Sequence, residues 1–220
     1  MRVVIAGGHG QVALRLERLL AARGDEVAGL IRNPDHAGDL SAAGAEPVVC
    51  DLEAASVEEV VGHVSGADAV VFAAGAGPGS GAARKETVDR AAAVLLADAA
   101  ERAGVRRYLM VSSMGADAPP PEGTDEVFAA YLRAKAAADA DLRRRDLDWT
   151  ILRPGRLTND PGTGRVRLAP KVEPGAVPRD DVAATLMALL DTPASAGLVL
   201  ELVAGDTPIP EAVAAVTAAR

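Results

Sequence analysis

The sequence opens with a short apolar run, Val3-Val4-Ile5, that passes directly into the glycine-rich turn Gly7-Gly8-His9-Gly10. The stretch that follows, Gln11–Ala22, repeats leucines at the spacing of one helix face. Glycines between a buried strand and a helix permit a tight turn, and they let backbone N–H groups approach a pyrophosphate at the helix N-terminus. The spacing Gly8-x-Gly10-x-x-Ala13 is therefore typical of a parallel α/β fold that binds a dinucleotide at its edge.

The rest of the chain alternates short β-branched runs with helical stretches. Strands are predicted at Arg2–Ala6, Glu26–Ile31, Glu46–Val49, Ala69–Phe72, Arg107–Val111, Trp149–Leu152 and Leu198–Val203. Helices are predicted at Gln11–Ala22, Ser56–Val61, Arg84–Ala103, Phe128–Arg145 and Asp180–Leu190. This order predicts right-handed βαβ units and an α/β fold with a Rossmann-like, doubly wound parallel sheet flanked by helices. In such a sheet, ligands bind beyond the carboxyl ends of the strands, near the switch in strand order.

Length, composition and charge narrow the class of protein. At 220 residues, we expect a single NAD(P)-binding Rossmann-like domain over residues 1–220, with small substrate-side elements near its C-terminus. A formal charge of −8 argues against nucleic acid as a partner. One cysteine and three scattered histidines predict neither a disulfide framework nor a metal site. Apolar stretches fall short of the ~20 residues that span a bilayer, so we expect a cytoplasmic protein without a membrane partner.

Candidate cofactor-binding residues follow the carboxyl ends of the predicted strands. They are Gly7, His9, Gly10, Gln11 and Val12 in the turn, Asp51 and Leu52 after the third strand, Ala73, Ala74 and Gly75 after the fourth, and Val111 and Ser112 at the end of the fifth. We expect His9 to contribute only its backbone N–H, and Asp51 to lie near the amino group of an adenine ring. The small residues after the fourth strand let a cofactor pass close to the backbone. The alternative is that the segments after the third and fourth strands are ordinary strand ends with no part in cofactor binding.

The residue type at the end of the second strand indicates whether NAD or NADP is preferred. Enzymes that prefer NAD usually place Asp or Glu there to hold the ribose 2′-hydroxyl, whereas this chain has Arg32-Asn33. A guanidinium at this position attracts a 2′-phosphate through charge-assisted hydrogen bonds. The sequence therefore favours NADP as the cofactor, with NADPH preferred over NADH. The alternative is a solvated surface arginine.

A second group of polar residues lies in the middle of the chain. Ser112-Ser113 follows the fifth strand, and Tyr131 and Lys135 lie four residues apart on the next helix, hence on one face. A tyrosine, with an ordinary pKa of about 10, can donate a proton to a carbonyl that receives hydride. Lys135 would stabilise the tyrosinate and hold a ribose, and Ser113 would hydrogen-bond the same carbonyl oxygen. Ser113, Tyr131 and Lys135 are thus the candidate catalytic residues, although Y-x-x-x-K by itself also occurs by coincidence on helix surfaces.

Two segments interrupt the alternation of strands and helices. Ala74–Ala83 is rich in glycine, and Asp117–Asp125 contains three consecutive prolines. Both are predicted to be loops at which a substrate docks, or else tolerated surface loops.

These features together resemble the atypical short-chain dehydrogenase/reductases of the NAD(P)H-binding, NmrA-like kind, which include small flavin and biliverdin reductases. The resemblance covers nearly the whole chain. It rests on the glycine turn, Arg32-Asn33-Pro34, Asp51-Leu52, Val88-Asp89-Arg90, residues 105–113 and 147–155, Leu157-Thr158, Pro161-Gly162-Thr163-Gly164 and residues 179–183. By this likeness, Pro154 and Gly155 would lie against the nicotinamide end of the cofactor, and Asp180–Val182 would start a helix that closes the site.

The resemblance implies an NAD(P)H-dependent oxidoreductase that transfers hydride to a small carbonyl, quinone or flavin-like acceptor. We expect a small-molecule substrate and a monomer or homodimer. A non-catalytic NAD(P)-binding redox sensor is the main alternative. A sugar-nucleotide epimerase or dehydratase shares the motifs but usually has a sizeable substrate lobe, whereas we expect only one strand and two helices after Pro154. A hydrolase is disfavoured because Gly77–Gly81 does not match G-x-S-x-G.

Overall fold

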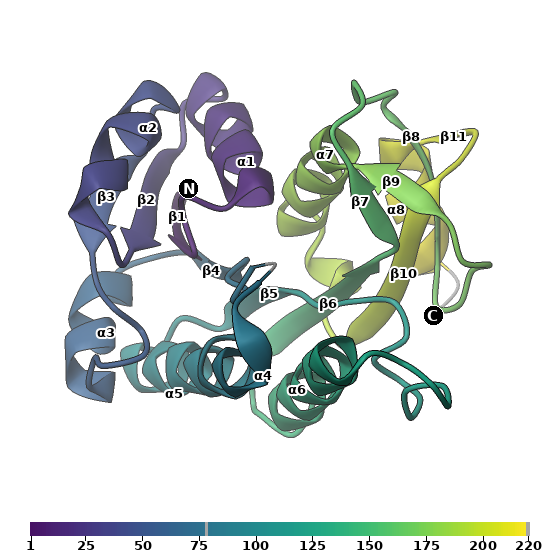
Figure 1. Cartoon of the computed structure of the whole chain (residues 1–220). Coiled ribbons are helices and arrows are strands. Elements are labelled where there is room, and N and C mark those ends of the chain that lie inside the picture. The colour runs from purple at the N-terminus through teal and green to yellow at the C-terminus, as the bar shows by residue number, and fades with distance from the viewer. Residues whose placement is uncertain (78, 219–220) are drawn as a thin grey trace.

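The seven predicted strands lie side by side in one sheet (Figure 1). The computed structural model describes residues 1–77 and 79–218. Its parallel strands are β1 (Arg2–Ala6), β2 (Glu26–Ile31), β3 (Glu46–Val49), β4 (Ala69–Phe72), β5 (Arg107–Val111), β6 (Asp148–Pro154) and β10 (Leu198–Ala204). Apart from the edge strand β3, their aliphatic side chains are mostly buried on both faces, as a parallel sheet between two helix layers requires.

The strand order reverses direction between β1 and β4. Within the described residues the order is β11-β8-β10-β6-β5-β4-β1-β2-β3, so the chain runs outward from β1 to β3 and then returns to the other side of β1. Neighbouring strands from β3 to β10 are parallel. This order is that of a Rossmann-like, doubly wound sheet, which confirms the predicted fold class. It directs a ligand to the carboxyl ends of the strands around β1 and β4.

Helices cover both faces of the sheet (Figure 1). One layer contains α1 (Gln11–Ala22), α2 (Ala37–Ala42), α7 (Arg179–Leu190) and α8 (Ile209–Ala218). The other contains α3 (Val57–Val64), α5 (Ala92–Ala103) and α6 (Glu126–Leu142). Short 3₁₀ turns, η1 (Pro34–His36) and η3 (Pro193–Ser195), complete the connections. None of the helices in the described part of the chain is both long enough and apolar enough to cross a membrane.

The helix predicted at Arg84–Ala103 is divided in the structure. It consists of α4 (Gly81–Arg84), a π-helical turn η2 (Lys85–Ala91) and α5. Part of the glycine-rich loop expected at Ala74–Ala83 therefore belongs to α4, and Pro78 of that loop lies outside the described residues. A π-helical turn is wider than an α-helical one, so it shifts the side chains that follow it, and such turns are frequent at functional sites. Here η2 packs against α6.

The segment after Pro154 contains more strands than the sequence analysis expected. In addition to β10, α7 and α8 it forms β7 (Arg156–Thr158), β8 (Arg165–Ala169), β9 (Ala176–Pro178) and β11 (Thr207–Pro208). β7 and β9 form a separate two-stranded sheet, while β8 and β11 extend the main sheet by antiparallel pairing. The expectation of one strand here is wrong: β7, β9 and β11 have only two or three residues and carry no periodic signal, while the alternation in the five-residue β8 was not recognised.

Glu17 is an acidic side chain in the core beneath the glycine turn. It is fully buried on α1, and neither carboxyl oxygen has a hydrogen-bond partner among the described residues. Its Oε1 packs so closely against the neighbouring turn and strand that a Cβ on Gly29 would lie 2.7 Å from it, and one on Gly8 3.0 Å. Burial raises the pKa of Glu17 to about 8, because the charged form would lose its hydration.

We expect the substitution Glu17→Gln to remove a pH-dependent loss of stability. The folded protein holds this proton up to about pH 8, whereas an ordinary glutamate releases it near 4.5. The free energy of unfolding of the unmodified protein therefore falls as the pH rises between these values, by on the order of 4 kcal/mol, since a tenfold difference in proton affinity is worth about 1.4 kcal/mol. Urea unfolding at about pH 5 and pH 8 measures the fall. An equally steep fall in the variant would contradict the prediction.

Candidate active site

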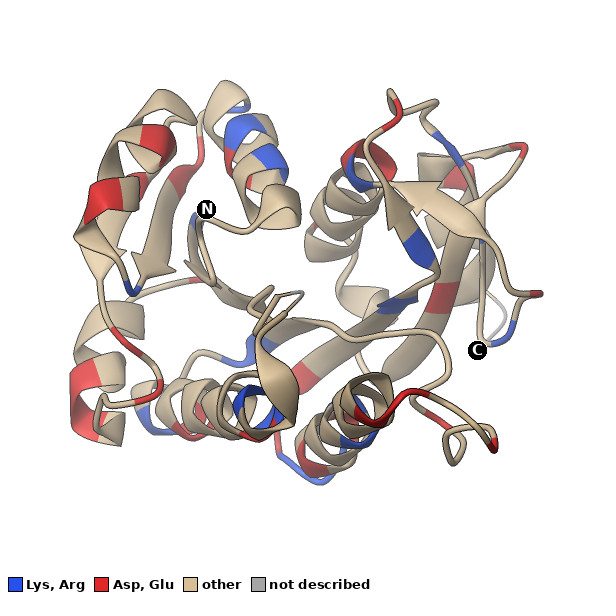
Figure 2. Ribbon diagram, in the orientation of Figure 1, with Lys and Arg blue, Asp and Glu red and all other residues tan. Residues whose placement is uncertain are grey.

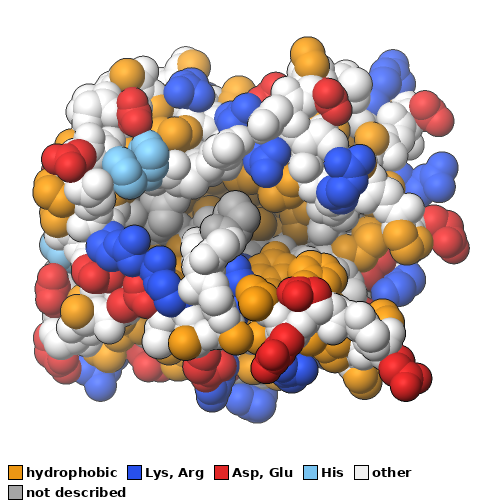
Figure 3. Space-filling view, viewed as in Figure 1, with side chains coloured by type: hydrophobic (Ala, Val, Ile, Leu, Met, Phe, Trp, Pro, Cys, Tyr) orange, Lys and Arg blue, Asp and Glu red, His pale blue; other side chains and the backbone are white. Residues whose placement is uncertain are grey.

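A pocket of about 800 Å³ opens at the carboxyl ends of β1 to β6. Figure 3 shows it as a hollow at the centre of one face, with basic side chains and histidines on its rim. The volume lies near the upper end of the range for cofactor and small-molecule sites. The candidate cofactor and catalytic residues all line this pocket: Gly7, His9, Gly10, Gln11, Val12, Arg32, Asn33, Asp51, Leu52, Ala73, Ala74, Gly75, Val111, Ser112, Ser113, Tyr131, Lys135, Pro154 and Gly155. The structure thus brings the predicted residues together, while their individual roles remain predictions.

The glycine turn forms one wall of the pocket. Gly7 has a φ of +80°, which favours glycine, and a Cβ there would lie 2.6 Å from the Cα of Ala74. The Gly10 N–H donates to the Gly7 carbonyl at 2.8 Å. No side chain in the described part of the chain caps α1. The N–H groups of its first turn, at Gln11 and Val12, are therefore left for a ligand, and the helix dipole adds positive potential there. This wall fits a phosphate group.

The side chain of His9 contacts two other residues beside the glycine turn. Its ring stacks on His36 with centroids 3.6 Å apart, and its Nε2 lies 2.8 Å from Oδ2 of Asp39. The ring thereby links the turn to η1 and α2. The side chain of His9 thus has partners within the protein, and the expectation that His9 offers only its backbone N–H to the cofactor stays a prediction.

Arg32 shares a carboxylate with a second arginine at the end of β2. Its Nη1 donates to Oε2 of Glu53 at 2.9 Å, and Nη2 of Arg84 donates to the same oxygen at 2.6 Å. Thr87 donates to the other oxygen at 2.6 Å. The hydrogen bonds from Arg84, Thr87 and Arg32 hold the pKa of Glu53 below its ordinary value. Two guanidinium groups and one carboxylate leave this group positively charged.

The sequence analysis missed Glu53 and Arg84. Glu53 follows β3 and Arg84 ends α4, so both are remote from Arg32 along the chain. Only the folding of β2 and β3 side by side, together with the hydrogen bond from Arg84 of α4 to Glu53, brings the three charges together, and no local pattern marks them. Figure 2 shows basic and acidic residues distributed over helices, strands and loops, with Asp and Glu prominent on α3.

Asp51 and Asn33 each use one side-chain oxygen in a local turn. Oδ1 of Asp51 accepts the Glu53 N–H at 3.0 Å, and Oδ1 of Asn33 accepts the Asp35 N–H at 3.1 Å. These bonds fix both side chains at the pocket wall. One carboxylate oxygen of Asp51 and the amide NH₂ of Asn33 remain available to a ligand.

The helix α6 carries Tyr131 and Lys135 to the pocket on one face. The Nζ of Lys135 lies 5.9 Å from the centre of the Tyr131 ring. Lys135 is only 4% exposed, donates to the Val111 carbonyl at 3.1 Å and lies 3.4 Å from Oδ1 of Asp89. The two residues of the Y-x-x-x-K pattern are therefore spatial neighbours, and Asp89 compensates the buried charge of the lysine.

The π-helical turn η2 adds two charged residues that the sequence analysis did not assign to the site. Asp89 is fully buried, and its Oδ2 accepts a backbone N–H at 3.2 Å, while Oδ1 makes no hydrogen bond with the described residues. Lys85 is 7% exposed, donates to the Gly77 carbonyl at 2.8 Å, and lies 5.5 Å from the Tyr131 ring centre. The Asp89 Oδ1 faces the Lys135 ammonium at 3.4 Å and can in addition accept a hydrogen bond from a ligand that carries hydroxyl groups, such as a ribose. The signal available in the sequence was a pair of charges on an otherwise apolar helix face, next to Val88 and Ala92.

The loop after β5 is tied to the end of β6. Ser112 is buried and Ser113 is half-buried, with its Oγ donating to the Met114 carbonyl at 3.1 Å. The Met114 N–H donates to the Pro154 carbonyl at 3.0 Å. This bond holds Ser113 and the Pro154-Gly155 segment next to each other at the pocket.

An aromatic side chain lies at the mouth of the pocket. Phe128 is 51% exposed, and its ring stacks on Tyr131 with centroids 5.9 Å apart. The loop predicted at Asp117–Asp125 reaches this region only through its last residue, because Asp125 lines the pocket and caps α6. Asp117, at its start, pairs with Lys171 at 2.9 Å and lines a separate cavity of about 400 Å³.

The first turn of α7 brings a different residue to the pocket from those that the resemblance implied. Asp180 and Asp181 do lie in its first turn, but Asp180 pairs with Arg15 at 2.5 Å, and Asp181 accepts the Gly164 N–H at 2.8 Å. These contacts fasten α7 to α1 and to the loop before β8. Arg179, rather than either aspartate, lines the pocket.

Comparison with known families and proteins identifies an NAD(P)H-binding family. The model of a family described as NAD(P)H-binding matches residues 7–193. The chain is 39% identical over 213 residues to an uncharacterized sugar epimerase of Bacillus subtilis, YhfK, a match that covers 96% of this chain and 98% of that protein.

Solved structures of similar sequence share the fold over almost the whole chain. A putative NAD-dependent epimerase/dehydratase from Bacillus halodurans has a TM-score of 0.90 at 36% identity, covering 98% of this chain and 99% of that one. ChuY, an anaerobillin reductase from Escherichia coli O157:H7, has a TM-score of 0.79 at 28% identity, covering 94% of this chain and 98% of that one.

Proposed function

Because this chain belongs to the NAD(P)H-binding family of atypical short-chain dehydrogenase/reductases, we propose that it is an NAD(P)H-dependent oxidoreductase acting on a small carbonyl, quinone or flavin-like acceptor. The observation that carries this proposal is that one pocket extends from the open N-terminus of α1 to the Tyr131–Lys135 pair. The similarity to the reductase ChuY supports the same class of reaction.

The cofactor would lie along the ends of the strands. In this arrangement the glycine turn holds the pyrophosphate, and Asp51 and Leu52 contact the adenine. Ala73–Gly75 lie beside the middle of the cofactor. Lys135, with Asp89 beside it, holds the nicotinamide ribose, and Pro154-Gly155 contacts the nicotinamide.

The residues around Tyr131 have the chemistry that carbonyl reduction needs. When bound, the dinucleotide supplies the hydride. The Tyr131 hydroxyl donates a proton to the acceptor oxygen, so the carbonyl gains one hydride and one proton and becomes an alcohol. Lys135 stabilises the tyrosinate left behind, which recovers its proton from solvent. Ser113, on turning its hydroxyl away from the Met114 carbonyl, donates to the same acceptor oxygen.

We further propose that NADPH is preferred over NADH. The support is the net positive group formed by Arg32, Arg84 and Glu53 at the end of β2. A 2′-phosphate would compete with the Glu53 carboxylate for the two guanidinium groups. Glu53 is also the residue that would hold the 2′-hydroxyl of NADH, so the balance between these charges sets the preference.

We expect Arg32→Ala to weaken NADPH binding by about 10- to 100-fold and to leave NADH binding nearly unchanged, because a charge-assisted hydrogen bond contributes roughly 1.5–3 kcal/mol. Calorimetric titration with both cofactors measures this. Arg18→Ala, which removes an exposed arginine on α1 outside the pocket, is the matched control. Equal affinity of the unmodified protein for both cofactors, or an equal loss of both in the variant, would contradict the preference.

A sugar-nucleotide epimerase is the second candidate, favoured by the names of the Bacillus relatives. Such an enzyme needs room for a nucleotide-linked sugar beside the cofactor. Of the described residues after Pro154, only Gly155, Leu157 and Arg179 line the pocket, so this part of the chain adds little substrate lobe. This geometry favours a smaller acceptor.

A panel assay decides among the candidate functions. We expect NADPH oxidation coupled to the reduction of at least one quinone, flavin or aldehyde. Conversion of a sugar nucleotide without net cofactor consumption would establish the epimerase instead. If no acceptor is reduced, but NADPH binds and changes the affinity for a partner protein, the redox sensor is the correct function.

A further inference from the structure

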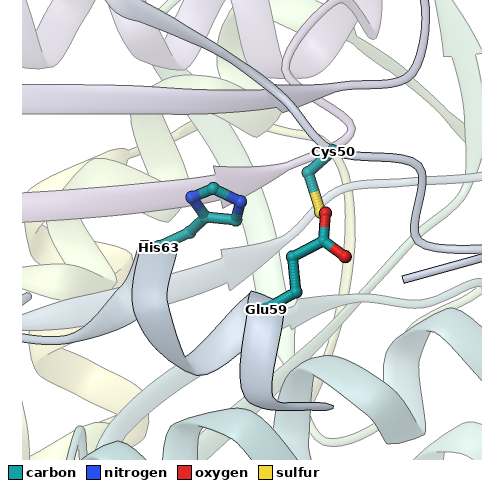
Figure 4. A group of neighbouring side chains, drawn as sticks. All are labelled: Cys50, Glu59 and His63. Atoms are coloured by element: carbon teal, nitrogen blue, oxygen red, sulfur yellow. The ribbon is translucent and has the colours of Figure 1, made fainter. Parts of the chain in front are cut away.

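Three side chains of the kinds that bind transition metals meet beside the end of β3. Cys50 follows β3, and Glu59 and His63 lie one turn apart on the same face of α3 (Figure 4). Their ligand atoms, the Cys50 Sγ, a Glu59 carboxylate oxygen and a His63 ring nitrogen, all lie within 4.8 Å of one another. We propose that these three residues bind one zinc ion, with water as the fourth ligand.

The distances suit a tetrahedral ion after small side-chain movements. Zinc–ligand bonds of about 2.0–2.3 Å place the ligand atoms of a tetrahedral site about 3.5 Å apart. Glu59 is exposed and His63 is half-buried, and neither side chain makes a hydrogen bond or ion pair with the described residues. Both can therefore rotate toward Cys50 without losing a hydrogen bond or an ion pair. Cys50 is 3% exposed and supplies the fixed ligand at the base of the site.

The donor set selects the metal. A thiolate together with an imidazole favours zinc, whereas magnesium and calcium prefer sites built entirely from oxygen ligands. Burial raises the pKa of the Cys50 thiol to about 11, with the charge of Glu59 acting in the same direction. The thiol is thus protonated before the metal arrives. Binding replaces the S–H bond by an S–Zn bond and releases one proton to solvent.

The site would connect two parts of the structure. Cys50 also lines the cofactor pocket, immediately before Asp51. An ion here would fasten the end of β3, and with it this wall of the pocket, to α3. The inference is independent of the proposed reaction, since none of the three ligands has a role in it.

Calorimetry with Zn²⁺, and absorption spectroscopy with Co²⁺ as a probe, test the site in the full chain free of any polyhistidine tag. We expect one ion per chain and a thiolate-to-cobalt charge-transfer band that is absent in Cys50→Ser. Glu59→Gln and His63→Asn should each weaken zinc binding by at least about 100-fold, more than the loss of an outer hydrogen-bond partner of a metal ligand usually costs. These two positions on α3 are not in the core, so they test the site even if Cys50→Ser fails to fold.

The matched control is His36→Asn, which removes a histidine from the His9–His36 pair and leaves the proposed site intact. We expect its zinc affinity to be unchanged. The inference is overturned if no ion binds, if the cobalt complex lacks the thiolate band, or if binding survives all three ligand substitutions. Loss of binding in His36→Asn would overturn it as well, because it would place the ion at the His9–His36 pair.

Discussion

Replacing Tyr131 with phenylalanine is expected to lower kcat for NADPH-dependent carbonyl reduction by about 100- to 10,000-fold, the usual contribution of a general acid. The substitution removes only a hydroxyl. The ring that stacks on Phe128 and lies near Lys85 and Lys135 is retained. The Kd for NADPH should therefore stay the same, so the loss appears in kcat. Steady-state kinetics on a carbonyl acceptor, together with calorimetric titration of the cofactor, measures both quantities.

Tyr108→Phe is the matched control for this substitution. Tyr108 is the other tyrosine of the chain, fully buried on β5, and its hydroxyl donates to the Ala93 carbonyl at 3.2 Å. Its removal should cost about 1 kcal/mol of stability and leave kcat unchanged. Full carbonyl-reducing activity in Tyr131→Phe would show that the proton comes from another group. The acceptor must be a carbonyl, because a flavin can take hydride without this proton.

Substitution of Tyr131 tests the proposed proton transfer more cleanly than substitution of Lys135. Removing Lys135 would leave the fully buried Asp89 carboxylate without its cation, and an unpaired buried charge typically costs several kcal/mol of stability. A loss of activity in a Lys135 variant would then mix misfolding with lost chemistry.

A second large effect is expected at the glycine turn. Gly10→Val should weaken NADPH binding by at least about 100-fold, the loss of two or more charge-assisted hydrogen bonds at roughly 1.5–3 kcal/mol each. The branched side chain would stand where the phosphate approaches the N–H groups of Gln11 and Val12. The backbone at Gly10, with a φ of −63°, accommodates valine, but its Cβ would lie 3.0 Å from the Gly7 carbonyl oxygen, so the turn must shift by a few tenths of an ångström. Calorimetric titration gives the affinity, and thermal unfolding checks that the fold persists.

Gly62→Val provides the comparison for the Gly10 substitution. Gly62 lies on the exposed face of α3, where an added Cβ has no neighbour within 4 Å among the described residues. This variant should bind NADPH with unchanged affinity. If Gly10→Val binds NADPH as tightly as the unmodified protein does, the phosphate groups of the cofactor lie elsewhere.

Local patterns in the sequence were sufficient to predict the parallel sheet and to place the pocket at the carboxyl ends of its strands. Apolar runs predicted the seven parallel strands, and the glycines between an apolar run and a helical pattern predicted a strand–turn–helix unit with an open helix N-terminus. The four-residue spacing placed Tyr131 and Lys135 on one face. These features depend on neighbours within a few residues, so a pattern in the chain suffices to read them. The alternation of Arg165, Val166, Arg167 and Leu168 in β8 was legible in the same way and was overlooked.

The tertiary structure alone decided which charges meet. Glu53 joins Arg32 to Arg84, and Asp89 reaches Lys135 because a π-helical turn packs against α6. The burial of Glu17, and the meeting of Cys50 with α3, likewise depend on how helices lie on the sheet. Each of these contacts joins segments that are distant in sequence or different in secondary structure. Their geometry is set by packing and not by local backbone preference, so residue type and spacing show at most that two side chains share a helix face, as Glu59 and His63 do, and not which partner they meet.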